Sequence, residues 1–343
     1  MSMIKENDAT SGRSDACEPG MAVAFCVNER FATPLAVALY SLLEHLQPAS
    51  SLVIYVFSSD LSEESQQGLN RIVSDFPQLN VILKVVHPDL SCLQNLPVNF
   101  RFTADNYTRL LLDRLIPEGC DRILYLDCDV LIAADISKLW SVPIEPWHAL
   151  AGRDMAIPVV SSLLGLRNFD KIGLRPDTPY FNSGVLMINL KKWRQDSITE
   201  ACLQYTTSHS EYIRWADQDS LNAVLAGKWG MLDVEWNFAP AFLGKILKDP
   251  TWPDHAVYAE RAEELRGSAA IYHYAGTFKP WNSYMAGMGY DMWTNTLYRS
   301  GWLSKSQRKG WPANVAWQSA KMFVTATNER RRALYYEWRQ SRR

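Results

Sequence analysis

The sequence has no apolar run long enough to cross a membrane as a helix, and no internal repeat. Residues 1–20 are polar and lack the apolar stretch of a secretory signal peptide. We therefore expect a protein that is soluble or only peripherally bound to a membrane. The formal net charge of −2 over 343 residues does not favour nucleic acid as a partner of the whole chain.

Closely spaced cysteine pairs are also missing. None of the six cysteines forms a Cys-x-x-Cys motif, and Cys26 and Cys128 lie inside apolar runs, as buried small hydrophobic residues do. We therefore expect reduced thiols, as in a cytosolic protein.

Hydrophobic residues make up 47% of the chain, which is enough to bury a large core. This content predicts one large α/β domain, alone or with an appendage. Aromatic residues reach 12%, and the thirteen tryptophans suit either core packing or stacking on sugar rings.

Composition divides the chain into three sections. Residues 1–20 predict a disordered lead-in, residues 21–284 carry the strand and helix patterns of a single folded domain, and residues 285–343 form a basic, aromatic segment. From Arg299 to Arg343 there are eleven Lys or Arg and only two Asp or Glu. An acidic body with a basic tail follows from this distribution.

The first part of the folded section alternates strands with helices. Apolar, β-branched runs predict buried strands at Met21–Val27, Leu52–Phe57 and Val81–Val86. Helical spacing and capping residues predict helices from Pro34 to Leu46 and from Ser62 to Phe76. This alternation is typical of a parallel sheet with helices against it.

Further elements follow along the chain. We expect helices at Asn106–Leu115 and Asp217–Ala226, strands at Arg122–Leu126 and Gly184–Leu190, a short helix or loop at Tyr258–Gly267 and a last strand beginning at Ile271.

Asp127-Cys128-Asp129 carries the sharpest chemical signal. Two carboxylates directly after a buried strand need a compensating cation, because uncompensated buried charge is costly. Ligands bind at the carboxyl ends of strands in open α/β sheets, and paired hard oxygen ligands suit Mg²⁺ or Mn²⁺. The alternative is a solvated pair of aspartates in a loop.

A second cluster extends from His273 to Trp281. Histidine is a good ligand for Mn²⁺, Gly276 permits close backbone approach to a phosphate, and Lys279 offers a point charge for a diphosphate. The alternative is a histidine whose hydrogen bonds are satisfied within an ordinary loop.

Weaker signals stand between these clusters. The run Phe181–Gly184 suits either a sugar pocket or a plain turn, and Asp217-Gln218-Asp219 suits either a site or an ordinary helix start. Single polar or aromatic residues without a pattern of their own are Arg109, Asp154, Glu235 and Trp236.

Together these segments resemble the retaining family 8 glycosyltransferases, in the family's order. They are Leu124–Leu131, Tyr180–Trp193, Ala216–Asn222 and His273–Trp281. The nearest similarity is to bacterial galactosyl- and glucosyltransferases that extend lipo-oligosaccharide or lipopolysaccharide cores. The resemblance implies an α/β, A-type glycosyltransferase fold: a single nucleotide-binding domain with a mixed, mostly parallel sheet flanked by helices, followed here by a basic helical tail.

The resemblance also implies the ligands and the residues that bind them. A Mn²⁺ ion, or Mg²⁺, is expected at Asp127, Asp129 and His273. The expected donor is UDP-glucose or UDP-galactose, and the expected acceptor is a saccharide of the lipid-linked class. The residues expected around the donor sugar are Arg109, Asn182, Ser183, Asp217 and Gln218. The residues expected along the nucleotide are Cys26, Asn28, Arg30, Asp127, Cys128, Gly276 and Lys279.

Catalysis in such enzymes retains the α configuration of the sugar. The family position for a far-face nucleophile corresponds to Gln218, and an amide is a poor nucleophile. We therefore favour a front-face mechanism in which the departing phosphate takes the acceptor's proton. Gln218, Asp217 and Asp154 are the candidate catalytic residues.

The tail predicts a membrane contact. Close relatives have a similar basic C-terminal segment, and an Arg-rich helix with Trp and Tyr suits an anionic membrane surface. We expect a cytoplasmic protein held at the inner face of the cytoplasmic membrane. A solvated helix on the acidic body, or a protein partner, is the alternative.

Three other functions fit parts of the sequence. Leu126–Leu131 is similar to the nucleophile motif of haloacid dehalogenase-type phosphatases, although that motif belongs on an early strand. A non-catalytic UDP-sugar-binding module would keep the same ligands. Nucleic-acid binding through the tail is a third, weaker option, which the acidic body opposes.

Overall fold

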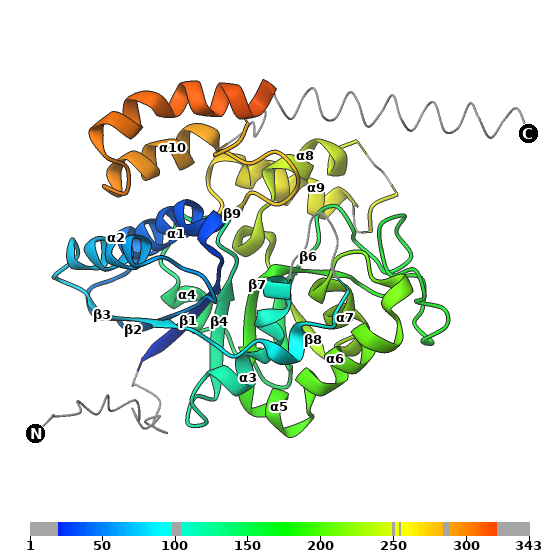
Figure 1. The fold of residues 1–343 in the computed structure, drawn as a ribbon. Helices are drawn as coiled ribbons and strands as arrows, with labels where there is room; N and C mark the ends of the chain where they lie inside the picture. Colours follow the sequence, from blue (N-terminus) through cyan, green and yellow to red (C-terminus); the bar gives the residue numbers. More distant parts are fainter. Residues whose placement is uncertain (1–19, 98–103, 249–250, 254, 284–288, 321–343) are drawn as a thin grey trace, which may run out of the picture.

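The computed structural model describes residues 20–97, 104–248, 251–253, 255–283 and 289–320, and shows a twisted sheet between layers of helices (Figure 1). The lead-in expected at residues 1–20 lies outside the described residues except for Gly20, and residues 321–343 of the tail lie outside them as well.

The first half of the sheet forms as predicted. Strands β1 (Met21–Cys26), β2 (Ser51–Phe57) and β3 (Asn80–Val86) pair in parallel, with helices α1 (Ala32–His45) and α2 (Glu63–Ser74) connecting them. The interior strands β1 and β2 are buried along almost their whole length, which explains their continuous apolar sequences.

Within the described residues, seven strands make the main sheet in the order β3-β2-β1-β4-β7-β6-β8. The second half comprises β4 (Arg122–Leu126), β6 (Ala149–Arg153), β7 (Phe181–Asn189) and β8 (Trp229–Leu232). Strand β7 is antiparallel to both of its neighbours, and the other adjacent pairs are parallel. The sheet is therefore mixed and mostly parallel, as expected.

A separate two-stranded sheet lies beside the carboxyl end of β4. It pairs β5 (Val130–Ile132) with β9 (Ile271–His273) in antiparallel orientation. The strand expected at Ile271 is thus present, although its partner, β5, has no strand signal of its own in the sequence analysis. This small sheet joins segments that are far apart along the chain.

The helix expected at Asn106–Leu115 has a different form. A 3-10 helix spans Ala104–Leu111, and only α3 (Leu112–Leu115) is α-helical. Tyr107 and Leu110 are both fully buried, and a 3-10 helix places residues three apart on one face. Tertiary packing therefore overrides the α-helical pattern here.

The remaining helices follow β5 along the chain. They are α4 (Ser137–Trp140), α5 (Leu190–Gln195), α6 (Ile198–Ser208), α7 (Asp217–Val224), α8 (Pro240–Ile246), α9 (His255–Glu264) and α10 (Tyr290–Arg299), followed by a helix over residues 305–320. The short-helix alternative for Tyr258–Gly267 is confirmed, because α9 and a 3-10 turn occupy this segment.

Two large clusters of buried side chains fill the two faces of the sheet. Val23 and Phe25 of β1 belong to the cluster with α1, whereas Ala22 and Ala24 belong to the cluster with α5 and α6. Successive side chains of a strand point to opposite faces, so β1 holds both clusters in place. Helices on both faces leave the carboxyl ends of β1 and β4 as the place for polar chemistry.

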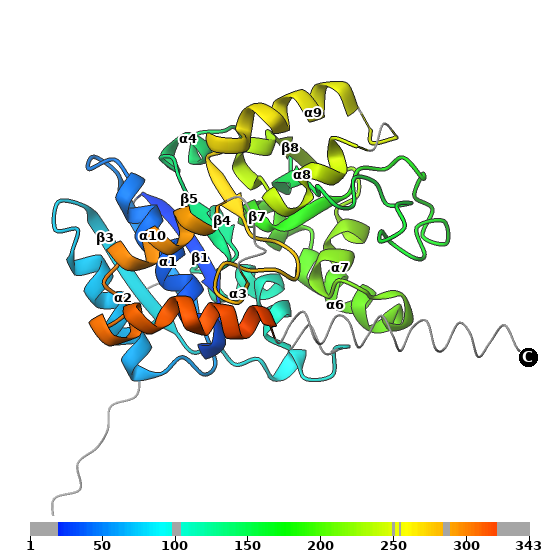
Figure 2. The ribbon, with the colours of Figure 1, turned by 90° about the horizontal axis from the view of Figure 1, so that it is seen from above.

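The C-terminal helices pack on the first helical layer, as the view from above shows (Figure 2). Arg299 of α10 forms an ion pair with Glu44 of α1, and the Nε1–H of Trp302 donates to Thr33 at 3.0 Å. The described helices include none that is both long and apolar enough to span a bilayer.

One expectation about the cysteines is wrong. Cys26, Cys92, Cys128 and Cys202 form no disulfide, but Cys120 is disulfide-bonded. The sequence has no closely spaced cysteine pair, and yet one of its thiols is oxidised. A disulfide depends on proximity in the fold, which sequence spacing does not report.

Candidate functional site

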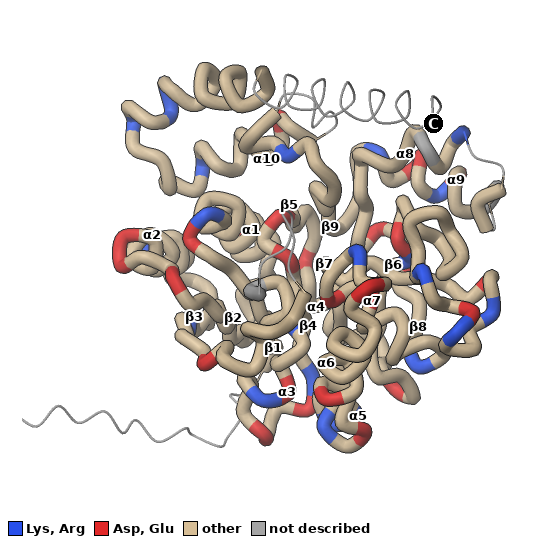
Figure 3. The backbone as a smooth tube through the Cα atoms, turned by 45° about the vertical axis from the view of Figure 1, so that its right-hand side comes forward, with Lys and Arg blue, Asp and Glu red and all other residues tan. Residues whose placement is uncertain are grey.

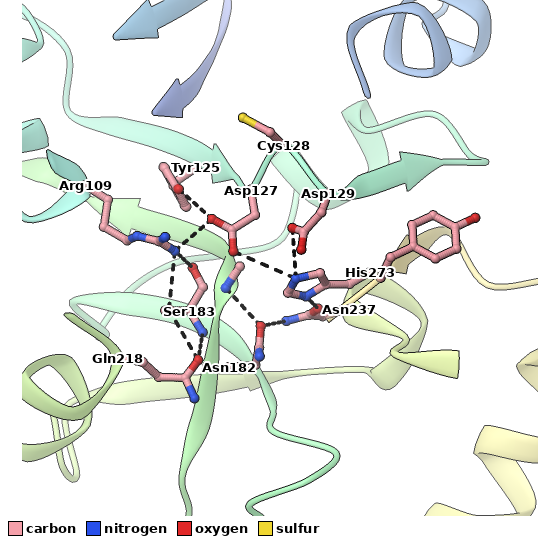
Figure 4. Close-up of polar contacts among 12 residues, drawn as sticks. Arg109, Tyr125, Asp127, Cys128, Asp129, Asn182, Ser183, Gln218, Asn237 and His273 are labelled. Atoms are coloured by element: carbon pink, nitrogen blue, oxygen red, sulfur yellow. Dashed lines mark hydrogen bonds and ion pairs between the residues drawn. The ribbon is translucent and has the colours of Figure 1, made fainter. Parts of the chain in front are cut away.

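The site begins where β4 ends. The backbone N–H of Asp127 donates to the carbonyl of Gly184 on β7 at 2.8 Å, and the chain then turns away before β5 starts at Val130. This turn leaves the side chains of Asp127 and Asp129 on the same side of the chain, one from each end of the turn (Figure 4). Asp129 is buried and Asp127 is half-buried.

His273 joins the two aspartates through the small sheet. Val130 of β5 pairs with His273 of β9, and this register places the imidazole Nε2 3.2 Å from Oδ1 of Asp129 and 3.8 Å from Oδ2 of Asp127. One ligand atom from each of the three residues lies within 4.8 Å of the others. The three residues predicted as metal ligands therefore converge on one point.

Gly184 leaves room for this convergence. A Cβ atom at this position would lie 2.3 Å from Cε1 of His273 and 2.9 Å from Oδ2 of Asp127. Neither atom can give way without moving a candidate ligand. The glycine is needed for the close approach of β7 to the imidazole, and not for an unusual backbone conformation.

Asn237 orients the histidine, and the sequence analysis missed it. Its Oδ1 lies 2.8 Å from the Nδ1 of His273, on the side of the ring opposite the aspartates. The neighbours that the sequence singled out have other contacts: Glu235 pairs with Arg261, and Trp236 packs in the core. The available signal was a lone asparagine inside an apolar run, between Trp236 and Phe238.

Lys279 reaches the same centre from the loop after β9. Its ammonium forms an ion pair with Asp129 and donates to the carbonyl of Tyr274 at 2.6 Å. Burial alone raises the pKa of Asp129, but the neighbouring charge of Lys279 and the imidazole of His273 outweigh burial, and the pKa lies below its usual value. A carboxylate held in its charged form is ready to bind a cation.

Arg109 links Asp127, one of the three candidate metal ligands, to helix α7. Its Nη1 is 2.9 Å from Oδ1 of Asp127, and its Nε is 3.1 Å from Oδ2 of Asp217. The hydroxyl of Tyr125 also donates to Oδ1 of Asp127 at 2.6 Å. Burial opposes the charge of Arg109, yet the two carboxylates raise its pKa above the usual value.

Asn222 brings helix α7 onto the start of β7. Its Oδ1 accepts the backbone N–H of Phe181 at 2.8 Å, and its Nδ2 donates to the carbonyls of Phe181 and Gln218 at 2.9 Å each. The turn before the helix is strained, because Ala216 has a φ of 50°. This clamp unites two segments that gave separate and weak sequence signals.

Gln218, Asn182 and Ser183 meet Asp154 inside this clamp. The Nε2 of Gln218 and the Nδ2 of Asn182 donate to Oδ2 of Asp154 at 3.1 and 3.0 Å, and Oε1 of Gln218 accepts the backbone N–H of Ser183 at 3.0 Å. Residues 181–184 therefore form the first part of β7 rather than the turn before it. The structure brings together all candidate donor-sugar residues.

Three of the candidate nucleotide residues, Cys26, Asn28 and Arg30, lie along the end of β1. Asn28 follows the strand, and its Oδ1 is buried without a hydrogen-bond partner among the described residues. Cys128 is buried, and its thiol donates to the carbonyl of Cys26 at 3.4 Å, facing away from the aspartates. Arg30 is exposed at the rim. The unpartnered oxygen of Asn28 is available to accept a hydrogen bond from a bound ligand.

Glu29, between Asn28 and Arg30, is engaged elsewhere. Its carboxylate accepts the backbone N–H of Ser62 at 2.8 Å and the hydroxyl of Ser65 at 2.8 Å, at the start of α2. Gly276, on the opposite rim, has a φ of 99°, a left-handed conformation that favours glycine. The two rims of the site therefore come from β1 and from the loop after β9.

Comparisons with known proteins agree with this architecture. The chain is 27% identical to General stress protein A of Bacillus subtilis, over 81% of this chain and 96% of that protein. It is also 27% identical to lipopolysaccharide 1,2-glucosyltransferase of Escherichia coli, over 83% of this chain and 80% of that protein. The crystal structure of the galactosyltransferase LgtC in complex with donor and acceptor sugar analogs superposes with a TM-score of 0.70 at 26% identity. It covers 84% of this chain and 99% of LgtC.

The fold is therefore the A-type glycosyltransferase fold, as the resemblance implied. The model of the family described as Glycosyl transferase family 8 matches residues 22–285, which is most of the chain and includes every candidate site residue. The chain belongs to glycosyl transferase family 8.

Proposed function

We propose that this glycosyltransferase moves glucose or galactose from a UDP-sugar to a saccharide acceptor, with retention of the α configuration and with Mn²⁺, or Mg²⁺, as its ion. The observation that carries the proposal is the convergence of Asp127, Asp129 and His273 beside the sugar-side network of Gln218. A structural histidine would not need two carboxylates at its Nε2.

The donor set fits a divalent ion. Two carboxylates and one neutral imidazole suit Mn²⁺, and two oxygen ligands with space for phosphate oxygens suit Mg²⁺. The absence of a side chain at Gly184 keeps the space between the ligands open. When bound, such an ion would neutralise the charge of a departing diphosphate.

The protein's own residues hold the donor on both sides of this point. The ammonium of Lys279 pairs with Asp129 and can move from this carboxylate to a diphosphate oxygen when the donor binds. Gly276 allows the loop to approach the phosphates closely. The amide of Asn28 offers its unpartnered oxygen to the base. Arg109 and Asn182 border the sugar side.

The chemistry proposed is a front-face displacement. The bond from C1 to the β-phosphate oxygen breaks, the acceptor hydroxyl forms the new bond to C1 on the same face, and its proton passes to the departing diphosphate. Gln218 is held by Ser183 and Asp154, so its carbonyl dipole is fixed beside the reacting centre. Asp217 is buried against Arg109 and acts through it.

A lipid-linked saccharide is the acceptor class we favour. The similarity to a lipopolysaccharide glucosyltransferase supports this choice, and so does the basic, aromatic tail, which suits an anionic membrane surface. Lysines and arginines, drawn blue, occur on the described C-terminal helices at the top of Figure 3. Lys305, Arg308 and Lys309 belong to the described part of the tail, and most of its cations lie beyond residue 320. Cytoplasmic location at the inner face of the membrane follows from this acceptor.

A donor screen tests the proposal. Release of UDP is measured with UDP-glucose, UDP-galactose and their N-acetyl forms, with and without Mn²⁺. We expect metal-dependent release from one of the two hexose donors, and loss of at least a hundredfold in rate for His273→Gln. If UDP is released from none of the donors, the alternative of a non-catalytic UDP-sugar-binding module is favoured. Turnover of p-nitrophenyl phosphate would favour the phosphatase alternative. The anomeric configuration of the product decides retention.

A further inference from the structure

Hydrogen bonds decide which nitrogen of His273 can bind a metal. The Nε2 faces Asp129, so a lone pair there requires the proton to sit on Nδ1. The Nδ1 faces the side-chain amide of Asn237 at 2.8 Å. An amide can present either its oxygen or its NH₂ group, and only the oxygen selects the tautomer that leaves Nε2 free. The orientation of Asn237 is therefore the deciding feature.

Asn182 determines that orientation. The backbone N–H of Gly184 can only donate, and it points at the Asn182 amide with an N–O distance of 2.9 Å. The other end of that amide meets Oδ2 of Asp154 at 3.0 Å, and an ionised carboxylate only accepts. Both contacts require the oxygen of Asn182 to face Gly184 and its NH₂ group to face Asp154.

The same polarity continues to the histidine. The oxygen of Asn182 also faces Asn237 at 3.0 Å, so Asn237 must present its NH₂ group there and its oxygen to Nδ1 of His273. The carboxylate of Asp154 is itself held by the backbone N–H groups of Ala156 and Ile157, at 2.7 and 2.8 Å. The chain of bonds is thus fully oriented from Asp154 to the imidazole.

The backbone keeps Asn237 and His273 at a constant spacing. The N–H of Phe238 donates to the carbonyl of Ile271 at 3.0 Å, and the N–H of His273 donates to the carbonyl of Phe238 at 2.8 Å. Asn237 is only 3% exposed, and Gly152 of β6 lies close against its Cβ. Burial and close packing therefore make a flip of the Asn237 side-chain amide unfavourable.

We propose that Asn237 is a positioning residue, which transmits the hydrogen-bond polarity of Asp154 and Asn182 to His273 and so keeps Nε2 unprotonated for the metal. The relay rests on the proposed metal-dependent function. It also connects the sugar side of the site to the metal side, because Asp154 holds Gln218 with the same oxygen that orients Asn182.

The first test reads the tautomer directly, in protein saturated with Mg²⁺, because the carboxylate of Asp129 can hold a proton on Nε2 when no ion is bound. Two-bond ¹H–¹⁵N spectra of ¹⁵N-histidine-labelled protein are recorded where imidazoles are neutral, and the His273 signals are identified by their loss in His273→Gln. We expect the proton on Nδ1 in the wild type and in Asn237→Asp, and a shift towards the Nε2–H form in Asn237→Leu. A wild-type His273 protonated on Nε2 overturns the relay.

The second test titrates Mn²⁺ by the EPR signal of the free ion. We expect Asn237→Leu to weaken binding by roughly 10- to 100-fold, the usual effect of removing a partner of a metal-binding histidine. Asn237→Asp keeps an oxygen that can accept from Nδ1 of His273, so the affinity for Mn²⁺ should be kept. Its second carboxylate oxygen would face the side-chain oxygen of Asn182, and this repulsion should lower the melting temperature. Asn168→Leu, a change at a buried asparagine that bonds to Tyr205, is the matched control for stability.

The outcomes separate the two proposals. Equal loss of Mn²⁺ affinity in the Leu and Asp variants, in proportion to their loss of stability, would mean that Asn237 only supports the fold. Wild-type affinity in Asn237→Leu would overturn the relay too. A wild-type protein that binds neither Mn²⁺ nor Mg²⁺ would overturn the proposed function, whereas ion binding with Nε2 of His273 still protonated would overturn the relay alone.

Discussion

Val130 pairs with His273 across the two-stranded sheet of β5 and β9, and this pairing sets the imidazole beside Asp129. Of the three candidate metal ligands, only Asp127 follows a strand of the main sheet, at the end of β4. The site therefore depends on a small sheet whose two strands are distant along the chain. Changes that shift this small sheet should affect the metal side while leaving the core intact.

Gly184→Ala tests the close approach of β7 to the imidazole. The new Cβ would lie 2.3 Å from Cε1 of His273, so the ring must move away from the aspartates. We expect at least a tenfold loss of Mn²⁺ affinity with a folded protein. Gly244→Ala is the control, because a Cβ there meets no atom within 4 Å. Wild-type Mn²⁺ affinity in Gly184→Ala would show that the ligands do not need this spacing.

The sequence predicted the separate parts of this site better than their connections. Asp127, Asp129 and His273 each stand in a recognisable motif, and the parallel strands around β1 follow from apolar runs. Asn237 could not be predicted from the sequence, because its role comes from contacts with residues that are 36 and 55 positions away. Local patterns report periodicity and capping, but they do not report which loops meet.

Two further differences have the same physical origin. The segment around Arg109 winds as a 3-10 helix, because packing of Tyr107 and the ion pairs of Arg109 outweigh local helix preference. Cys120 forms a disulfide, although Cys128, its nearest cysteine in the sequence, takes no part in one. In both cases the long-range contact decides the local state.

Lys279→Gln should separate metal affinity from donor affinity. Without nucleotide, the ammonium of Lys279 occupies Asp129 and competes with a divalent ion for that carboxylate. We expect Mn²⁺ to bind several-fold more tightly to the variant in the absence of UDP, and the KM for the donor to rise at least tenfold. Titration of Mn²⁺ and steady-state kinetics measure the two effects. A parallel loss of both affinities would contradict the competition.

Arg109→Met should destabilise the fold strongly. The substitution leaves Asp127 and Asp217 without their shared cation, and breaking a buried ion pair typically costs about 3–5 kcal/mol. Arg114→Met is the matched control, since its pair with Glu200 is exposed and worth under about 1 kcal/mol. Urea unfolding without metal compares them. Similar losses for the two variants would mean that Arg109 is not the organising cation.

Removal of residues 321–343 tests the membrane contact. These residues contain seven Lys or Arg and two Asp or Glu, and each cation near an anionic surface contributes about 1 kcal/mol. We expect the full chain to sediment with phosphatidylserine vesicles at low salt, and the shortened chain to bind at least tenfold more weakly. Phosphatidylcholine vesicles are the control. Unchanged binding after the deletion would favour a protein partner or a solvated tail.

Asp217 gives a prediction for stability against pH. Burial is the largest cause that raises its pKa to about 6 from an ordinary 3.8, although Arg109 opposes the shift. Between these two values the native protein keeps a proton that the unfolded chain releases. The stability contributed by this proton is fully present below about pH 4 and is lost as the pH rises through about 6.

Asp217→Asn removes this dependence, because the amide resembles the protonated acid and does not titrate. The difference in unfolding free energy between wild type and variant should therefore change across pH 4 to 7 by up to about 3 kcal/mol, to the disadvantage of the wild type at higher pH. Urea unfolding of the metal-free proteins at several pH values measures it. A constant difference would mean that Arg109 holds Asp217 ionised throughout, and that the carboxylate enters catalysis with its charge in place.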